Sequence, residues 1–256
     1  MGRRESYDAG IFSWTDLATT DVDAAKALYA DLFGWDYDDQ PIPAGGTYSM
    51  ARVDGLAVAG LSEVQAEGQP PAWTAYVTVD DADATAAKAA ELGGTLLAEP
   101  FDVMDAGRMA VIADPAGAIF AVWKAGTSIG AELVNGHGLL SLTQLNTTDP
   151  ERATEFYSGL FGWRFERTEG TEIPYWGMYL GDHLNAGMMQ LQPDQGAPPH
   201  WLVYFGIDDI DAAAETLGAA GGTLLVPKMP VPGGEIVVAQ DPQGAVLGVF
   251  TGRFDE

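Results

Sequence analysis

The sequence predicts an α+β fold built from four βαβββ modules, which form two domains of mixed β-sheet. Three observations support this prediction. The stretch WTDLATTDVDAAKALYADLFGW at residues 14–35 returns as LTQLNTTDPERATEFYSGLFGW at residues 142–163. In both copies a strand-like stretch precedes apolar residues at helical spacing. Each half then restarts the strand-and-helix pattern and carries a DPxG turn before its last strand, at residues 114–117 and 241–244.

The repeat divides the chain into two homologous halves. FGW at residues 33–35 matches FGW at residues 161–163, and PPxW and GGT motifs recur at the same offset. The offset shortens by one residue at the DPxG turns, which indicates a deletion in a loop. We predict two domains, residues 9–125 and 137–253, joined by the glycine-containing linker GTSIGAELVNG.

The first module begins with a predicted strand at residues 11–18. A helix is predicted from Asp21, a typical N-cap residue, to a stop at Gly34. Short strands are predicted around residues 47–53 and 56–64. The helix prediction depends on the apolar residues that recur at helical spacing: Ala25, Leu28, Tyr29, Leu32 and Phe33.

The second module repeats this order. The strand AWTAYVTV leads to a predicted helix from about Asp81 to Leu92, which Gly93-Gly94 should stop. Strands are predicted near residues 95–99, 108–113 and 118–123. The second half follows the same plan, and Pro150 just after Asp149 suits a first helical turn.

Composition narrows the classes of partner. The chain has 256 residues, 47% of them hydrophobic, and no apolar run of the roughly 18 residues that a membrane span needs. Its 37 acidic and 12 basic residues leave a net charge of −25, which would repel nucleic acids and anionic membranes. No signal peptide is visible and there is no cysteine. We therefore expect a cytoplasmic monomer or homodimer that binds neither nucleic acid nor membrane.

The motifs together resemble the vicinal oxygen chelate (VOC) superfamily, which has the glyoxalase, bleomycin-resistance and extradiol-dioxygenase fold. The resemblance rests on the strand, helix and LFGW order, on VDDADA at residues 79–84 and IDDIDA at residues 207–212, and on the DPxG turns. The resemblance covers nearly the whole chain. With its two halves in tandem, the chain is also similar to glyoxalase-like proteins of actinobacteria. The resemblance implies two glyoxalase-like domains whose sheets curl into cups that hold a ligand.

The resemblance also implies where metal ligands would stand, because metal-dependent members carry histidine or glutamate at fixed strand positions. The fourth-strand position offers only Asp182 and His183, in the second half. His183 is predicted in a hairpin turn, His137 in the linker and His200 at a strand start. We therefore predict no metal and no cofactor. The residues at the other positions cannot supply an imidazole or a carboxylate: Trp14, Thr74 and Ala121 in the first half, and Leu142, Leu202 and Gly248 in the second.

Strand alternation places a largely apolar and aromatic set of side chains on the faces that carry these positions. Such a lining is typical of small-molecule pockets. For each of these residues, packing inside the sheet is an equally good interpretation, and Trp35, Trp73, Trp163 and Trp201 fit a core role better. The predicted ligand-binding residues are Trp14, Asp16, Thr74, Tyr76, Trp123, Leu142, Gln144, Asn146, His200, Leu202 and Tyr204.

The sequence favours a metal-free protein that binds a small aromatic or hydrophobic molecule, for sequestration, transport or resistance, including in secondary metabolism. No catalytic residue is assigned. The alternative is a lyase, isomerase or oxygenase-like enzyme that uses an atypical metal site or acid–base chemistry at Asp16 or His200. A structural interaction protein is a third class, although no sequence feature indicates a partner surface.

Overall fold

A computed structural model describes residues 2–42, 45–66, 68–170, 173–192 and 196–253. It contains two eight-stranded mixed sheets, one from each half of the chain. The first sheet has the order β3-β4-β5-β2-β6-β9-β8-β7. Its strands are β2 (Phe12–Thr19), β3 (Asp36–Pro41), β4 (Thr47–Val53), β5 (Leu56–Glu63), β6 (Ala72–Thr78), β7 (Thr95–Val103), β8 (Gly107–Ala113) and β9 (Ile119–Ala125).

The second sheet repeats the first with the order β12-β13-β14-β11-β15-β18-β17-β16. A small ribbon pairs β1 (Gly2–Arg3) with β10 (Leu133–Val134). The strands of the second sheet are β11 (Leu140–Thr147), β12 (Arg164–Arg167), β13 (Tyr175–Leu180), β14 (His183–Gln190), β15 (His200–Gly206), β16 (Thr223–Val231), β17 (Gly234–Gln240) and β18 (Val246–Gly252).

Two βαβββ modules join in the middle of each sheet. β2 pairs antiparallel with β6, the first strand of the next module, and each of these strands pairs in parallel with the last strand of its own module, β5 or β9. β11, β15, β14 and β18 are paired in the same way in the second sheet. The predicted fold class is therefore confirmed: the chain has four βαβββ modules in two sheets.

Four helices connect the strands as the capping signals predicted. They are α1 (Val22–Phe33), α2 (Ala82–Glu91), α3 (Pro150–Phe161) and α4 (Ile210–Ala219). The Asp21 side chain accepts a hydrogen bond from the Ala24 amide at 3.0 Å, and Gly34 ends α1 in the left-handed region with a φ of 71°. Such a φ favours glycine, which explains the FGW motif at this position.

The structure differs from the sequence-based expectation at β1, β3, β10 and β12, which were not predicted, and at His183. β3, DYDDQP, lacks apolar alternation and was not predicted, because an exposed edge strand needs no buried face. His183 was expected in a hairpin turn, but it is the first residue of β14 and pairs with Leu180.

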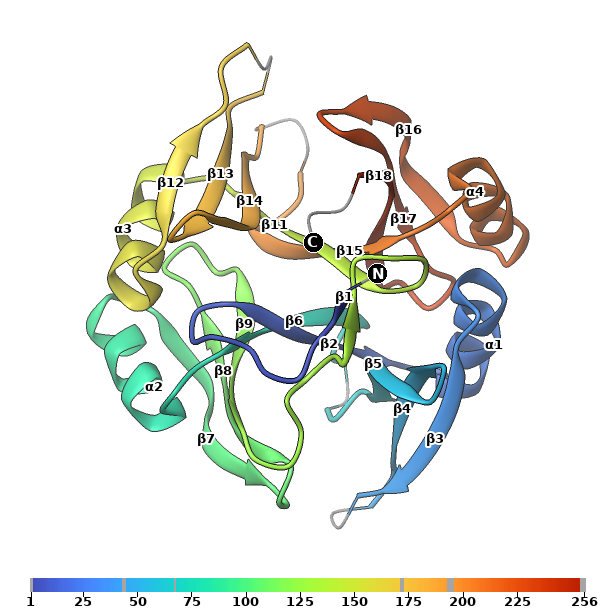
Figure 1. Cartoon of the computed structure of the whole chain (residues 1–256), viewed down its shortest axis with the longest axis horizontal. Helices are drawn as coiled ribbons and strands as arrows, with labels where there is room; N and C mark the ends of the chain where they lie inside the picture. The colour runs from blue at the N-terminus through green and yellow to red at the C-terminus, as the bar shows by residue number, and fades with distance from the viewer. Residues whose placement is uncertain (1, 43–44, 67, 171–172, 193–195, 254–256) are drawn as a thin grey trace.

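The halves pack through their helices and a shared core. α1 lies against α4, and α2 lies against α3, on opposite sides of the molecule (Figure 1). The largest cluster of buried apolar side chains draws on both halves and includes Trp35, Trp73, Trp163 and Trp201. These four tryptophans are thus core residues, as their motifs indicated.

Buried hydrogen bonds tie the halves together twice, with the same geometry. The Tyr29 hydroxyl donates to Asp241 Oδ2 at 2.8 Å, and its repeat partner Tyr157 donates to Asp114 Oδ2 at 3.1 Å. Both aspartates come from the DPxG turns of the opposite half. The indoles of Trp35 and Trp163 similarly donate to backbone carbonyls of the other half. The repeated motifs therefore encode the contact between halves as well as each module.

Each sheet has a second face, opposite the shared core, which we call its cup. The first cup contains a cluster around Trp14, Tyr76, Ala121 and Trp123. The second cup contains a smaller cluster around Leu142, Leu202, Tyr204 and Phe250. The curl of both sheets is visible in Figure 1. No helix in the described part of the chain is long and apolar enough to cross a membrane.

Candidate functional site

The register of the first sheet brings its predicted site residues together. Trp14 lies opposite Tyr76, Asp16 lies opposite Thr74, and Tyr76 pairs with Ala121 on β9. Trp123 joins Trp14 and Tyr76 in the same apolar cluster. The three aromatic side chains are buried, whereas Asp16 and Thr74 are half-buried.

Asp16 is the polar centre of the first cup. Its Oδ2 accepts hydrogen bonds from the Tyr76 hydroxyl at 2.8 Å and from the Tyr48 hydroxyl at 3.4 Å. The Trp14 indole donates to the Tyr48 oxygen at 3.0 Å. Burial raises the pKa of Asp16 to about 6, although the two tyrosine hydrogen bonds oppose this rise. The carboxyl group can therefore take up or release a proton near neutral pH.

The linker covers the first cup. The Ala131 amide donates to the Ser13 carbonyl at 2.7 Å, and the Glu132 carboxylate accepts from the Ala57 amide at 2.7 Å. Tyr7, from the N-terminal segment, donates to the Ala131 carbonyl at 2.6 Å. Ala131 and Val134 are buried in the same cluster as Trp14. What the sequence indicated as a connecting segment is thus also part of the first cup.

The second cup has the smaller apolar cluster. Among the described residues, its apolar cluster has three buried members, Leu202, Tyr204 and Val238, against eight in the first cup. All its members belong to strands of the second sheet, and Leu142 and Phe250 keep part of their surface accessible. Within the described part of the chain, the second cup therefore lacks the linker contribution that the first cup has.

Three predicted site residues of the second cup form a chain of hydrogen bonds. Gln144 Nε2 donates to Asn146 Oδ1 at 2.8 Å, and Asn146 Nδ2 lies 3.1 Å from His200 Nε2. His200 Nδ1 lies 2.8 Å from the Pro198 carbonyl oxygen. Gln144 and Asn146 are buried, whereas His200 is half-buried. Asp16 and His200 lie in different sheets, so the structure does not join them in one site.

Two tyrosines in the cups were missed from the sequence. Tyr48 lies across Gly60, and Tyr175 lies across Gly187, so closely that a Cβ on either glycine would collide with the tyrosine hydroxyl. Gly60 pairs with Asp16, and Gly187 pairs with Gln144. A glycine inside a strand often marks such a close approach, and that signal could have revealed both tyrosines.

The cups do not fit the metal centre that metal-dependent relatives of this fold carry. A Cβ at Gly248 would collide with the Tyr204 ring, and the space beside Gly60 is taken by Tyr48. Trp14 and Ala121, at two further positions, belong to the apolar cluster. Nowhere in the described ranges do three histidine, aspartate or glutamate side chains gather closely enough to hold a metal ion. The side chains at these positions therefore offer a metal ion apolar surface in place of ligands.

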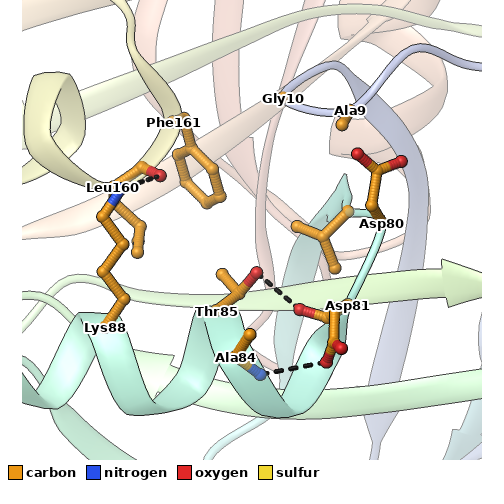
Figure 2. Close-up of a pocket in the computed structure, with 10 residues that line it drawn as sticks. Ala9, Gly10, Asp80, Asp81, Ala84, Thr85, Lys88, Leu160 and Phe161 are labelled. Carbon is orange, nitrogen blue, oxygen red and sulfur yellow. Dashed lines mark hydrogen bonds between the residues drawn. The ribbon is translucent and has the colours of Figure 1, made fainter.

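Two cavities lie outside the cups. The larger, of about 280 Å³, lies between α2 and the end of α3, where the halves meet (Figure 2). Asp81 in its wall caps α2 through the Ala84 amide, and Lys88 donates to the Leu160 carbonyl at 3.5 Å. The smaller, of about 200 Å³, lies beside the start of β4. The polar groups named in the larger cavity are engaged in holding the helices in place.

Comparison with known proteins gives matches over nearly the whole chain. The family model described as Glyoxalase/Bleomycin resistance protein/Dioxygenase superfamily matches residues 11–122 and again 139–249. A Mycobacterium tuberculosis protein provisionally named glyoxylase CFP32 is 42% identical over 98% of both chains. The anthracycline biosynthesis protein DnrV of Streptomyces peucetius is 34% identical over 95% of this chain and 94% of its own.

Solved structures share the fold at lower identity. The Mn(II)-bound glyoxalase from Novosphingobium aromaticivorans superposes with a TM-score of 0.66 at 17% identity, covering 95% of this chain and 82% of that one. The 2,2',3-trihydroxybiphenyl 1,2-dioxygenase from Sphingomonas wittichii also has a TM-score of 0.66, at 13% identity, covering 96% and 91% of the two chains. At these identities the likeness shows a common fold.

Proposed function

The chain belongs to the Glyoxalase/Bleomycin resistance protein/Dioxygenase superfamily, and from this premise we propose that it binds a small aromatic or hydrophobic molecule in its cups without a metal. The proposed role is sequestration, transport or resistance. In this proposal the second cup is the primary site, because the linker adds Ala131 and Val134 to the apolar cluster of the first cup.

One observation carries this proposal: in each cup an apolar residue and a hydrogen-bonding residue stand two positions apart on the same strand face. Trp14 precedes Asp16 on β2, and Leu142 precedes Gln144 on β11, with the two members of each pair on the same face. A flat guest with one or two polar atoms suits such a surface. A metal chelate does not, because the positions that would hold its ligands carry apolar or small residues.

The names of two relatives support a role in secondary metabolism. DnrV of Streptomyces peucetius and DauV of another Streptomyces strain are both named as anthracycline biosynthesis proteins, and their matches span 94% of their own lengths. We therefore propose that the guest of this protein is an intermediate or product of such a pathway, with an aromatic or otherwise apolar body.

A second candidate function is acid–base catalysis at Asp16. The observation that favours it is the pKa of this carboxyl group, which burial raises to about 6. A carboxylate with that pKa can accept a proton from a bound molecule near neutral pH. This enzyme would act in the first cup, so a guest would have to displace the linker contacts of Ala131 and Glu132.

The proposal is tested by titrating an aromatic compound, selected by a thermal-shift screen, into four variants. Leu142→Ala and Gln144→Ala should lower the affinity for a compound that binds in the second cup. Trp14→Ala and Asp16→Ala should lower the affinity for a compound that binds in the first. Loss of the Trp14 ring should cost about 1 kcal/mol of stacking beyond simple burial. Loss of Asp16 should change selectivity rather than affinity alone, because the cup then lacks a hydrogen-bond partner for polar guests.

Leu97→Ala serves as the control, since this leucine is exposed on the edge strand β7. Calorimetric titration gives the affinities, and circular dichroism shows which variants remain folded. If all four cup variants are folded and bind the compound as the control does, the guest lies outside the cups and the proposal is wrong.

A further inference from the structure

We infer that Asn146 and His200 orient Gln144 so that the second cup selects guests that donate a hydrogen bond. The inference deepens the proposed function and rests on it. It concerns Gln144 as a specificity-determining residue, with Asn146 and His200 as positioning residues. The class of guest is a hydroxylated aromatic molecule, preferred over an otherwise equal molecule that can only accept hydrogen bonds.

The orientation of the two amides follows from which groups can donate and which can accept, starting at the Pro198 end of the hydrogen-bond chain. The Pro198 carbonyl can only accept, so His200 Nδ1, at 2.8 Å, must carry the hydrogen. In a neutral imidazole the other nitrogen, Nε2, is then an acceptor. The group of Asn146 that faces it at 3.1 Å must therefore be the NH₂ group, Nδ2.

The same logic fixes the two amides. With Nδ2 of Asn146 turned towards His200, its carbonyl oxygen Oδ1 faces Gln144. Only the NH₂ group of Gln144 can donate to that oxygen, at 2.8 Å. The carbonyl oxygen Oε1 of Gln144 is thereby left at the free end of the chain.

That oxygen is available to a guest. The Gln144 side chain is 8% exposed and lies on the cup face of β11, opposite Leu202. Among the described residues, no donor is within hydrogen-bonding distance of Oε1, and this atom is not one of the fully enclosed polar atoms that lack partners. A buried acceptor without a partner penalises any guest that brings no donor to it.

Tyr175 supplies a complementary group. Its hydroxyl lies over Gly187, the residue that pairs with Gln144 in the parallel register. Burial raises the pKa of Tyr175 to about 12, so the group remains a neutral phenol that can donate. A guest hydroxyl could thus donate to Gln144 and accept from Tyr175, whereas an ether oxygen could only accept.

The first cup lacks this arrangement. The residues equivalent to Gln144, Asn146 and His200 are Asp16, Ala18 and Ala72, so no chain of amides and imidazole exists there. Asp16 already accepts hydrogen bonds from two tyrosines. Selection by an oriented amide is therefore specific to the second cup.

The test compares 2-naphthol with its methyl ether, 2-methoxynaphthalene, by calorimetric titration into the full chain. We expect the wild-type protein to prefer 2-naphthol roughly tenfold, as one hydrogen bond to a buried acceptor implies. Gln144→Met should abolish the preference, chiefly by raising the affinity for the ether, which then no longer leaves a buried acceptor unpaired. The same exchange at the exposed Gln65 should leave the preference as in the wild type.

Two variants of Asn146 separate positioning from simple packing. Asn146→Asp keeps an acceptor for the Gln144 NH₂ group and should retain the preference. Asn146→Leu lets the Gln144 amide turn over and should lower the preference severalfold. A loss of preference in both variants, or in neither, would overturn the positioning role.

The outcomes distinguish this inference from the proposed function. If both naphthalenes bind the wild-type protein equally and Leu142→Ala weakens both, the proposed function holds and the inference is wrong. If neither compound binds, the proposed function and the inference both fail for this class of guest. If 2-naphthol is preferred but Gln144→Met keeps the preference, selection resides elsewhere and the inference fails alone.

Discussion

Asp114→Ala is expected to lower the free energy of unfolding by about 3 kcal/mol or more. Oδ1 of this buried aspartate accepts hydrogen bonds from the backbone amides of Ala116, Gly117 and Ala118, at 2.8 to 2.9 Å. Oδ2 accepts from the Tyr157 hydroxyl of the other half at 3.1 Å. Alanine would remove the turn and the contact between halves together. Equilibrium denaturation followed by tryptophan fluorescence measures the loss.

Asp114→Asn is the matched control for this experiment. The asparagine keeps an acceptor for the turn amides and a polar group towards Tyr157. The free energy of unfolding should therefore fall clearly less in this variant than in Asp114→Ala. Tyr157→Phe removes the contact between halves and also the acceptor of the Trp201 indole, which donates to the Tyr157 oxygen at 2.9 Å, and should cost about 1 to 2 kcal/mol. A destabilisation by Asp114→Ala no larger than that of Tyr157→Phe would show that the hydrogen bonds from Asp114 to the turn amides add nothing to stability, against this prediction.

Asp16→Asn is expected to change how stability depends on pH. The folded-state pKa of Asp16 is about 6, against a reference value of 3.8 for the unfolded chain. Between these values the folded state binds more protons than the unfolded state, so stability falls as pH rises through this window. Below this pH range the carboxyl group is protonated in both states. Above it the group is ionised in both states, and the folded state carries the full cost of burying the carboxylate.

Asparagine does not titrate, so the variant avoids this loss. Relative to the wild type, its free energy of unfolding should rise by about 2 to 3 kcal/mol between pH 4 and pH 7. Denaturation at several pH values gives the difference. Asp31→Asn, at an exposed position, is the control for the loss of one carboxyl group. A constant difference for Asp16→Asn would mean that the carboxyl group is better solvated than its place in the first cup implies.

The sequence predicted most of the fold because its signals are local. Asp21 and Gly34 mark the ends of α1 through capping, and the repeat showed that the second half follows the same plan. A core role was also favoured over ligand contact for Trp35 and Trp163, and both lie in the largest buried cluster. β3 was missed, since an exposed polar edge strand shows no hydrophobic periodicity.

The cups could be predicted only in part. Alternation along β2 and β11 placed Asp16 and Gln144 correctly on the cup faces, because that pattern is a property of single strands. The contacts of Tyr48 with Asp16, and of the linker with Ser13, join segments far apart in the chain. No local pattern encodes such pairings. The hydrogen-bond chain from Gln144 to Pro198 likewise required the register between β11 and β15.

A crystal structure with the tightest-binding aromatic compound from the screen tests the central claim most directly. We expect the compound in a cup, and foremost in the second, against Leu142 with a polar atom near Gln144, and no metal ion between it and the protein. The compound in the cavity between α2 and α3, or a metal ion held by His183 or His200 at the compound, would contradict the proposed function.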